Sequence, residues 1–138
     1  MTKDEIFSFI NENPIFCLAT SAGNVPYVRC MMIYRADEGG IIFATGENKE
    51  LCEQLSKNPC VEMCFSDINE RIQVRVAGTV EAVEDYEMRQ EVGCNDPFLK
   101  QWVDKKGYDV VVVYCLKRGK ATVWTMENNL NPKEYVQL

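Results

Sequence analysis

Short apolar runs separated by polar turns recur along most of the chain, and this pattern predicts β-strands joined mainly by hairpins. Segments 21–24 (Ser-Ala-Gly-Asn) and 37–40 (Asp-Glu-Gly-Gly) have the composition of tight turns between antiparallel strands. The run 109–116 is apolar at almost every position, which predicts a strand buried on both faces. We therefore expect strands over residues 15–20, 25–34, 41–45, 60–65, 72–83, 109–116 and 121–126.

The longest expected strand shows the clearest alternation. Val74 and Val76 alternate with Gln73 and Arg75, so one face of this strand is apolar and the other is polar. Gly78 predicts a bulge or bend, beyond which we expect the strand to continue to residue 83. For the polar face, either an ordinary barrel surface or a set of ligand-binding side chains fits the pattern.

Helical spacing replaces the alternation in four places. Thr2 and Glu5 have the spacing of a capping box, and Leu51 and Leu55 lie four residues apart among charged residues. We expect helices from residue 2 to about residue 13, and over 47–57, 84–92 and 97–103. The sum is a single domain, 1–138, of mainly β class: an antiparallel barrel of six to seven strands with a few short helices.

Composition and charge exclude several classes of protein. The 138 residues are 46% apolar and 26% charged, which is the mix of an ordinary globular protein. The net charge is −6 and the basic residues are scattered, so no nucleic-acid-binding stripe is present. No apolar run approaches the roughly 18 residues of a membrane span. The charged start of the chain does not resemble a secretory signal, and we expect a cytoplasmic protein.

Seven cysteines and the absence of histidine limit the chemistry. No CxxC pair occurs, so we predict no metal site. Because most cysteines lie within apolar runs, we expect them to be reduced and buried. Without histidine the commonest acid–base group is missing, so any catalysis should rely on a cofactor. The cysteines are Cys17, Cys30, Cys52, Cys60, Cys64, Cys94 and Cys115.

A group of residues around the second and third strands is suited to an anion. Arg29 lies in an otherwise apolar strand, where a charge must reach solvent or meet a fixed anion. Thr45 and Gly46 end the third strand, and Asn48 and Lys49 follow at the expected start of a helix. A hydroxyl, a glycine, a lysine and free helix N–H groups together favour phosphate. The alternative is a strand-to-helix turn whose Lys49 faces solvent.

Other candidates are equally compatible with a structural role. Gln73 can both donate and accept hydrogen bonds, which suits the edge of a heterocycle. Trp124 fits either a core position or a place beside an aromatic ligand. Met31, Met32 and Tyr34 are core-like unless a flat ligand lies over them.

Taken together, these segments resemble the pyridoxamine 5′-phosphate oxidase-like family of FMN-binding split barrels, and within it the short nitroimidazole-reductase-like branch. The resemblance covers the chain from residue 5 to about residue 126. The matching stretches are 26–29 (Pro-Tyr-Val-Arg), 42–49 (Ile-Phe-Ala-Thr-Gly-Glu-Asn-Lys), 54–62, 72–78 (Ile-Gln-Val-Arg-Val-Ala-Gly) and 119–124.

The resemblance implies a homodimer with two FMN molecules in clefts between the subunits. It implies a reduced flavin that passes two electrons to a small-molecule acceptor, and thus an FMN-dependent oxidoreductase. By this likeness Trp124 comes from the other subunit. The implied phosphate group is Arg29 and Lys49 with Thr45, Gly46 and Asn48 nearby, and the implied ring contacts are the backbone of Cys30, Met31 and Met32 together with Gln73 and Trp124.

The chain also departs from the family pattern. The oxidases carry an Arg-x-His-Asp-Arg segment near the C-terminus, whereas this tail contains no histidine, so we do not expect pyridoxamine oxidation. The usual histidine ligand of heme is missing as well. Tyr34, Tyr108 and Arg75 are conceivable proton donors or polarising groups, but no residue is assigned as catalytic. The alternatives are a non-enzymatic flavin-binding or sensing module, a deazaflavin-dependent reductase, and an empty barrel that serves as an interaction domain.

Overall fold

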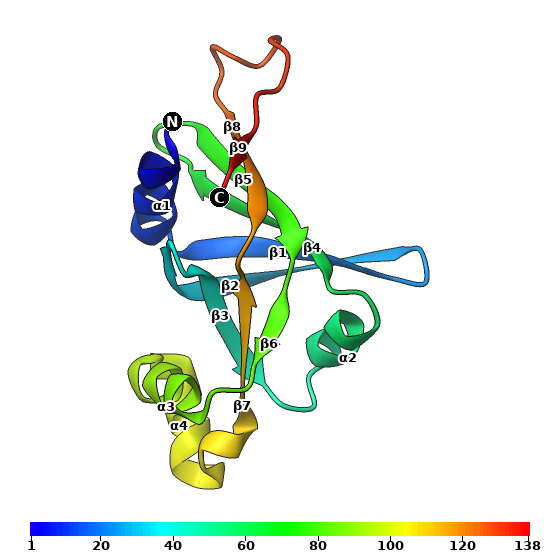
Figure 1. Ribbon diagram of the computed structural model, residues 1–138, viewed down its shortest axis with the longest axis vertical. Helices are drawn as coiled ribbons and strands as arrows, with labels where there is room; N and C mark the ends of the chain where they lie inside the picture. The colour runs from blue at the N-terminus through cyan, green and yellow to red at the C-terminus, as the bar shows by residue number, and fades with distance from the viewer.

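Nine antiparallel strands form one continuous sheet that curls into a split barrel, with four α-helices around it, in a computed structural model that describes residues 1–138 (Figure 1). The order of neighbouring strands is β6-β7-β3-β2-β1-β4-β5-β8-β9. The strands are β1 (Ile15–Ala22), β2 (Val25–Asp37), β3 (Gly40–Gly46), β4 (Cys60–Asp67), β5 (Ile72–Thr79), β6 (Glu81–Val83), β7 (Val111–Leu116), β8 (Gly119–Trp124) and β9 (Val136–Gln137). The helices are α1 (Lys3–Glu12), α2 (Glu50–Lys57), α3 (Tyr86–Asn95) and α4 (Pro97–Lys106), with a 3₁₀ turn at Tyr108–Val110.

Strand β2 connects the two halves of the barrel. Its first part, Val25 to Met32, pairs with β1. From Ile33 onward it pairs with β3, and the register shifts between Ile33 and Arg35. The strand therefore changes partner near its middle, where the barrel opens.

The predicted class is confirmed, and the differences lie mainly at element ends. The predicted strand over 72–83 is wrong in its second part, because β5 ends at Thr79 and β6 pairs with β7 in the other half. Between them the N–H of Val80 donates to the carbonyl of Pro59 over 3.0 Å, where the chain passes from one half of the barrel to the other. The second helix begins at Glu50 instead of residue 47. The polar tail, for which no element was predicted, adds the short edge strand β9.

The main core fills the barrel and is built around aromatic rings. Phe16 stacks on Phe65 with ring centroids 5.1 Å apart and meets Phe43 edge-on at 5.8 Å. Val74 and Val76 are fully buried, which confirms the face predicted from the alternation. These side chains come from both halves of the barrel, so their packing holds the halves together.

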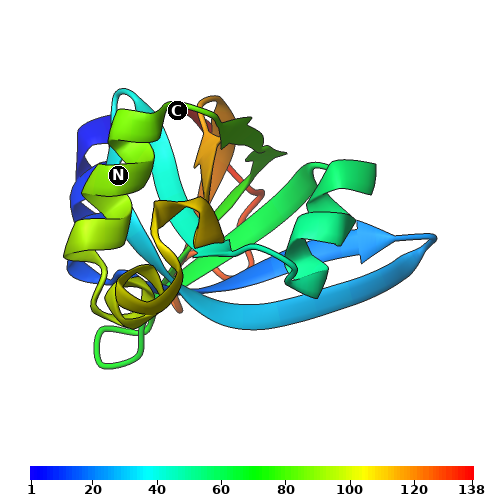
Figure 2. The same cartoon turned by 90° about the horizontal axis from the view of Figure 1, so that it is seen from below.

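A second core lies on the other face of β7. Val92 of α3 and Leu99 of α4 pack on Val111, Val113 and Cys115. Strand β7 is therefore covered on both faces, as its continuous apolar run predicts. Figure 2 shows α3 and α4 together on one side of the molecule and α2 on the other side, beside the β1–β2 hairpin. None of the helices has the length and apolar character needed to cross a membrane.

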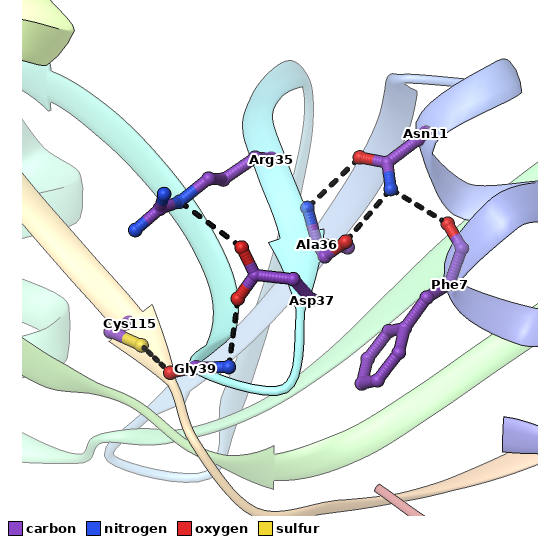
Figure 3. Close-up of polar contacts among 7 residues, drawn as sticks. All are labelled: Phe7, Asn11, Arg35, Ala36, Asp37, Gly39 and Cys115. Atoms are coloured by element: carbon purple, nitrogen blue, oxygen red, sulfur yellow. Dashed lines mark hydrogen bonds and ion pairs between the residues drawn. The ribbon is translucent and has the colours of Figure 1, made fainter. Parts of the chain in front are cut away.

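Helix α1 is fastened at its start and near its end. The predicted capping box is present, because Thr2 Oγ1 accepts from the Glu5 N–H and the Glu5 carboxylate accepts from the Thr2 N–H. Asn11 Oδ1 accepts from the N–H of Ala36, and its Nδ2 donates to the carbonyls of Ala36 and Phe7 (Figure 3). One side chain thus joins the helix to the end of β2.

The expectation that the cysteines are buried is wrong for all but one. Cys115 is buried, whereas the others are exposed or half-buried, and all seven are free thiols. Alternation explains the error: within the apolar segment of β1, Phe16 and Leu18 point inward, so Cys17 between them points outward.

The aromatic stack yields a stability prediction. We expect Phe16→Ala to lower the free energy of unfolding by about 3–5 kcal/mol, because Phe16 is 1% exposed and its removal leaves a cavity between two rings. As a matched control, Ile68→Ala should change it by less than about 0.5 kcal/mol, since Ile68 is 86% exposed. Urea unfolding of both variants measures this, and equal values for the two would contradict the assignment of the core.

Candidate functional site

A cavity of about 410 Å³ opens where β2 changes partner, between the end of β3, the start of α2 and helix α4. We call the part around Arg29, Thr45 and Lys49 its polar end, and the part around Met31, Met32, Phe98 and Trp102 its apolar wall. Six of the residues predicted to bind cofactor line it: Arg29, Cys30, Met31, Met32, Thr45 and Lys49. The other lining residues were not predicted: Ala44, Glu50, Leu51, Asp96, Phe98, Leu99 and Trp102.

Arg29 is held at the polar end by two buried polar side chains. Its guanidinium donates to Thr20 Oγ1 over 2.8 Å and to Gln54 Oε1. Thr20 Oγ1 also donates to Gln54 Oε1 over 2.6 Å, and both residues are 4% exposed. Gln54 reaches inward because it lies on the buried face of α2 with Leu51 and Leu55. The sequence predicts either solvent or a fixed anion as the partner of Arg29. The structure shows a third kind of partner, the neutral amide of Gln54.

The polar end has unused capacity for an anion. Neither Thr20 nor Gln54 carries a charge, so the guanidinium meets no carboxylate in its hydrogen bonds. Burial lowers the pKa of Arg29, and Glu50 opposes that shift by charge attraction. Even so, an arginine keeps its proton in proteins. Gln54 Nε2 is buried and has no hydrogen-bond partner. Arg29 is half-buried and lines the cavity, whereas Gln54 does not, so the guanidinium is the group through which this cluster could meet an anion.

Lys49 and Trp102 both line the cavity and contact each other. The Lys49 ammonium lies 5.2 Å from the centre of the Trp102 ring, within cation–π distance. The ring also packs on Gly46, where an added Cβ would come within 2.9 Å of it. Gly46 is therefore buried behind Trp102 instead of facing the cavity. Trp102 comes from a segment far away in the sequence, so no local pattern pointed to it.

The turn between β3 and α2 leaves the helix start uncapped by any side chain. Lys49 is the N-cap residue, and it makes no side-chain hydrogen bond to the helix. Asn48 precedes it with a φ of 60° and lines a neighbouring cavity together with Lys49. The first N–H groups of α2 thus remain available near Arg29 and Thr45, which line the same cavity as Glu50.

Gln73 and Trp124 do not join this cavity. They are directly opposite each other on β5 and β8 and line two other cavities, of about 730 and 790 Å³. The core position considered for Trp124 is wrong, because the side chain is half-exposed and its Nε1 donates to Asn129 Oδ1 over 2.7 Å. The predicted cofactor residues of one chain therefore form two separate groups.

The side chains considered as proton donors lie outside the cavity. Tyr34 packs toward α3. Its burial and, to a smaller extent, its hydrogen bond to Glu91 raise its pKa. Arg75 pairs with Glu62 at 3.4 Å. Tyr108 meets Tyr86 edge-on. None of the three lines the cavity that holds Arg29, although Arg75 lines one of the cavities of Gln73 and Trp124.

Known proteins show a consistent likeness. The family model described as pyridoxamine 5′-phosphate oxidase matches residues 2–115. A pyridoxine/pyridoxamine 5′-phosphate oxidase of Agrobacterium fabrum is 34% identical over 86 residues, which is 62% of this chain and 42% of that enzyme. The enzyme of the same description from Maricaulis maris is 29% identical over 114 residues, 80% of this chain and 51% of that enzyme. The chain thus spans about half the length of the curated relatives it matches.

Solved structures agree on the fold. A NimC/NimA family protein from Clostridium acetobutylicum superimposes with a TM-score of 0.80 at 22% identity, over 98% of this chain and 92% of that one. A heme-binding protein from Mycobacterium smegmatis gives 0.69 at 14% identity, over 96% of this chain and 56% of that one. The split barrel is common to them, and the match of the family model over most of the sequence shows that the chain belongs to the pyridoxamine 5′-phosphate oxidase family.

Proposed function

We propose that the chain binds FMN in a composite site between two copies of itself and acts as an oxidoreductase on a small-molecule acceptor. One observation carries this proposal: the lining of the cavity beside β2 divides into two cations, Arg29 and Lys49, and a set of thioether and aromatic side chains. A phosphate joined to a flat heterocycle has the same division into a charged and an apolar part.

The polar end would hold the phosphate. Arg29 and Lys49 supply the charge, Thr45 supplies a hydroxyl, and the uncapped start of α2 supplies N–H groups. Glu50 lines the same cavity, and its carboxylate attracts Arg29. When a phosphate binds, the guanidinium would contact the phosphate directly in place of this attraction to Glu50. Thr20 and Gln54 would keep the Arg29 side chain in place during that exchange.

The apolar wall would hold the ring system. Met31 and Met32 lie on β2, and Phe98 and Trp102 lie on α4 on the other side of the cavity. The register of the sheet gives Cys30 no partner on β3, because pairing with β3 starts only at Ile33. The backbone of Cys30 is therefore suited to hydrogen bonds with the edge of a heterocycle, as the resemblance implies.

A second copy would complete each site. Gln73 and Trp124 are implied to contact the ring, yet they lie in other cavities of the same chain. The outer face of the sheet also carries exposed apolar side chains, with Ile15 at 68% and Val28 at 70% exposure. A homodimer that buries this face would bring Gln73 and Trp124 of one subunit toward Arg29 of the other.

When bound, FMN would supply two-electron chemistry, and the residues of this chain would bind and orient it. Arg29 and Lys49 would fix the phosphate end, while Met31 and Trp102 would exclude water from the ring. Tyr34 and Tyr108 line none of these cavities, whereas Arg75 lines the cavity of Gln73 and Trp124, so a composite site would bring only Arg75 of the three near the ring. The alternative is a flavin-binding module without turnover. A deazaflavin in place of FMN would use the same phosphate contacts.

We expect Arg29→Ala/Lys49→Ala to weaken FMN binding by about a hundredfold or more, because each charge-assisted contact contributes about 1.5–3 kcal/mol. Titration of FMN followed by flavin fluorescence and absorption measures the dissociation constant. Lys57→Ala is the matched control, since Lys57 is exposed and pairs only with Glu53 on α2. Unchanged affinity of the double variant would place the phosphate elsewhere, and failure of the unaltered protein to bind FMN would refute the cofactor assignment.

Mixed dimers test the composite site. One subunit carries Arg29→Ala/Lys49→Ala, and the other carries Gln73→Ala/Trp124→Ala. We expect each variant alone to bind FMN weakly, whereas mixed dimers purified through two different tags should bind one FMN per dimer. This follows because one of the two clefts then receives both intact groups. Mixed dimers that bind no flavin would show that the site does not combine residues of two subunits.

Turnover distinguishes an enzyme from a carrier. With FMN bound, we expect NADH or NADPH to bleach the flavin absorption near its visible maximum, and a nitroaromatic or quinone acceptor to restore it repeatedly. The signal is followed in the absence of oxygen. Free FMN at equal concentration is the control. A protein that holds FMN tightly but accelerates neither half of the cycle over free FMN would be a binding module.

A further inference from the structure

The two cations of the cavity, Arg29 and Lys49, are both held by uncharged partners. The guanidinium donates to Thr20 Oγ1 and Gln54 Oε1, and the Lys49 ammonium lies 5.2 Å from the centre of the Trp102 ring. None of the ion pairs of the chain includes either cation. Both therefore keep their charge available for an anion that enters the cavity.

Glu50 is the acidic residue next to Lys49 in the sequence. It follows Lys49 directly and lines the same cavity, yet no ion pair joins the two. An ion pair would bring a carboxylate to the ammonium and weaken its attraction for a second anion. The face of an aromatic ring attracts the cation through its quadrupole without neutralising it. The side of the ammonium that points away from the ring thus keeps N–H donors for a phosphate.

The Trp102 ring is itself fixed by the barrel. It packs on Gly46 at the end of β3, where an added Cβ would come within 2.9 Å of the ring. Leu99, three residues earlier on α4, is 4% exposed and packs in the second core with Val111. Residues three apart are neighbours on the surface of a helix. The place of the ring is therefore set by the packing of α4 on the sheet and does not depend on Lys49.

A fixed contact matters for Lys49 because its side chain is long and exposed. Lysine loses more rotamer freedom than most side chains when it is held in one place. A contact that restricts the ammonium before a ligand arrives reduces the part of this loss that binding must offset. Trp102 would in this way strengthen the contact between Lys49 and a phosphate without touching the phosphate.

We propose that Trp102 is a positioning residue whose ring holds the Lys49 ammonium at the cavity and thereby raises the preference for FMN over riboflavin, the same flavin without its phosphate. The inference rests on the proposed function, because it takes the phosphate of FMN to be bound by Lys49. Trp102 then has this role in addition to its place in the apolar wall, and the two roles are separable. Loss of the wall weakens the binding of both flavins, whereas loss of the Lys49 contact weakens the binding of FMN alone.

The test compares the two flavins in four full-length chains: unaltered, Trp102→Leu, Lys49→Ala and the double variant. Titration followed by flavin fluorescence gives the dissociation constants, and the preference is the ratio of the riboflavin constant to the FMN constant. We expect Trp102→Leu to lower the preference about three- to tenfold, because the cation–π contact and the restriction of the lysine are both lost. Lys49→Ala should lower it about tenfold or more. In the Lys49→Ala background, Trp102→Leu should leave the preference unchanged.

Two further variants show whether the face of the ring is responsible. Trp102→Phe keeps an aromatic face and should retain part of the preference that Trp102→Leu loses. Phe98→Leu is the matched control, because Phe98 lies on the same helix and lines the same cavity but has no cation over its ring. It should change the binding of FMN and of riboflavin by the same factor. Far-UV circular dichroism verifies that every variant is folded.

Three results would overturn the proposal. Equal weakening of both flavins by Trp102→Leu would show that Trp102 acts only as part of the wall. An equal loss of preference with and without the Lys49 ammonium would show that Trp102 acts by another route. A Trp102→Phe chain that loses as much preference as Trp102→Leu would show that an aromatic face is not the feature that matters.

A measurement without flavin separates this inference from the cofactor assignment. Lysines that carry isotope-labelled methyl groups give separate NMR signals, and Lys49→Arg identifies the Lys49 signal by its absence. In the flavin-free chain we expect the Trp102 ring to shift this signal upfield, and we expect the shift to disappear in Trp102→Leu. Absence of the shift would overturn the inference whether or not FMN binds. A shifted signal in a chain that binds no FMN would refute the proposed function and the phosphate preference together, and only the contact would stand.

Discussion

Strand β2 is shared by both halves of the barrel, and the place where it changes partner determines where the cavity forms. Its first part pairs with β1 and its last part pairs with β3. The residues just before Ile33 therefore have no partner strand on the β3 side. Arg29 and the three residues after it lie at this transition. The end of β3, the start of α2 and helix α4 close around the free side. Without the change of partner, β3 would cover these positions and no cavity would remain.

The charge of Arg29 is accommodated by neutral dipoles. A carboxylate partner would neutralise the guanidinium and leave little to attract an anion. Thr20 and Gln54 instead orient it while leaving its charge uncompensated by hydrogen-bonded partners, and Gln54 retains one unpaired N–H donor. This arrangement costs stability when nothing is bound, because a buried donor without a partner is unfavourable.

Local patterns predicted most of the elements, since alternation, capping and turn composition act over a few residues. They predicted Val74 and Val76 as core and Thr2 as a cap, and they grouped Arg29 with Thr45 and Lys49. They failed where distant segments decide the outcome. Trp102 reaches the cavity only because α4 packs beside β3, and the chain crosses at Val80 because Pro59 offers a carbonyl there. The expectation that Cys17 and Cys30 are buried is wrong because successive residues of an apolar strand alternate between its two faces.

The two outermost strands of the sheet are its shortest. β6 has three residues and β9 has two, so little unpaired backbone is presented at either border. Long exposed borders are where sheets of different molecules join side by side, a route to fibrils. In this fold, each outermost strand offers only a short template for lateral growth of the sheet, and the broad outer face remains the surface through which copies can associate. The short outer strands of the sheet thus favour closed assemblies over open-ended ones.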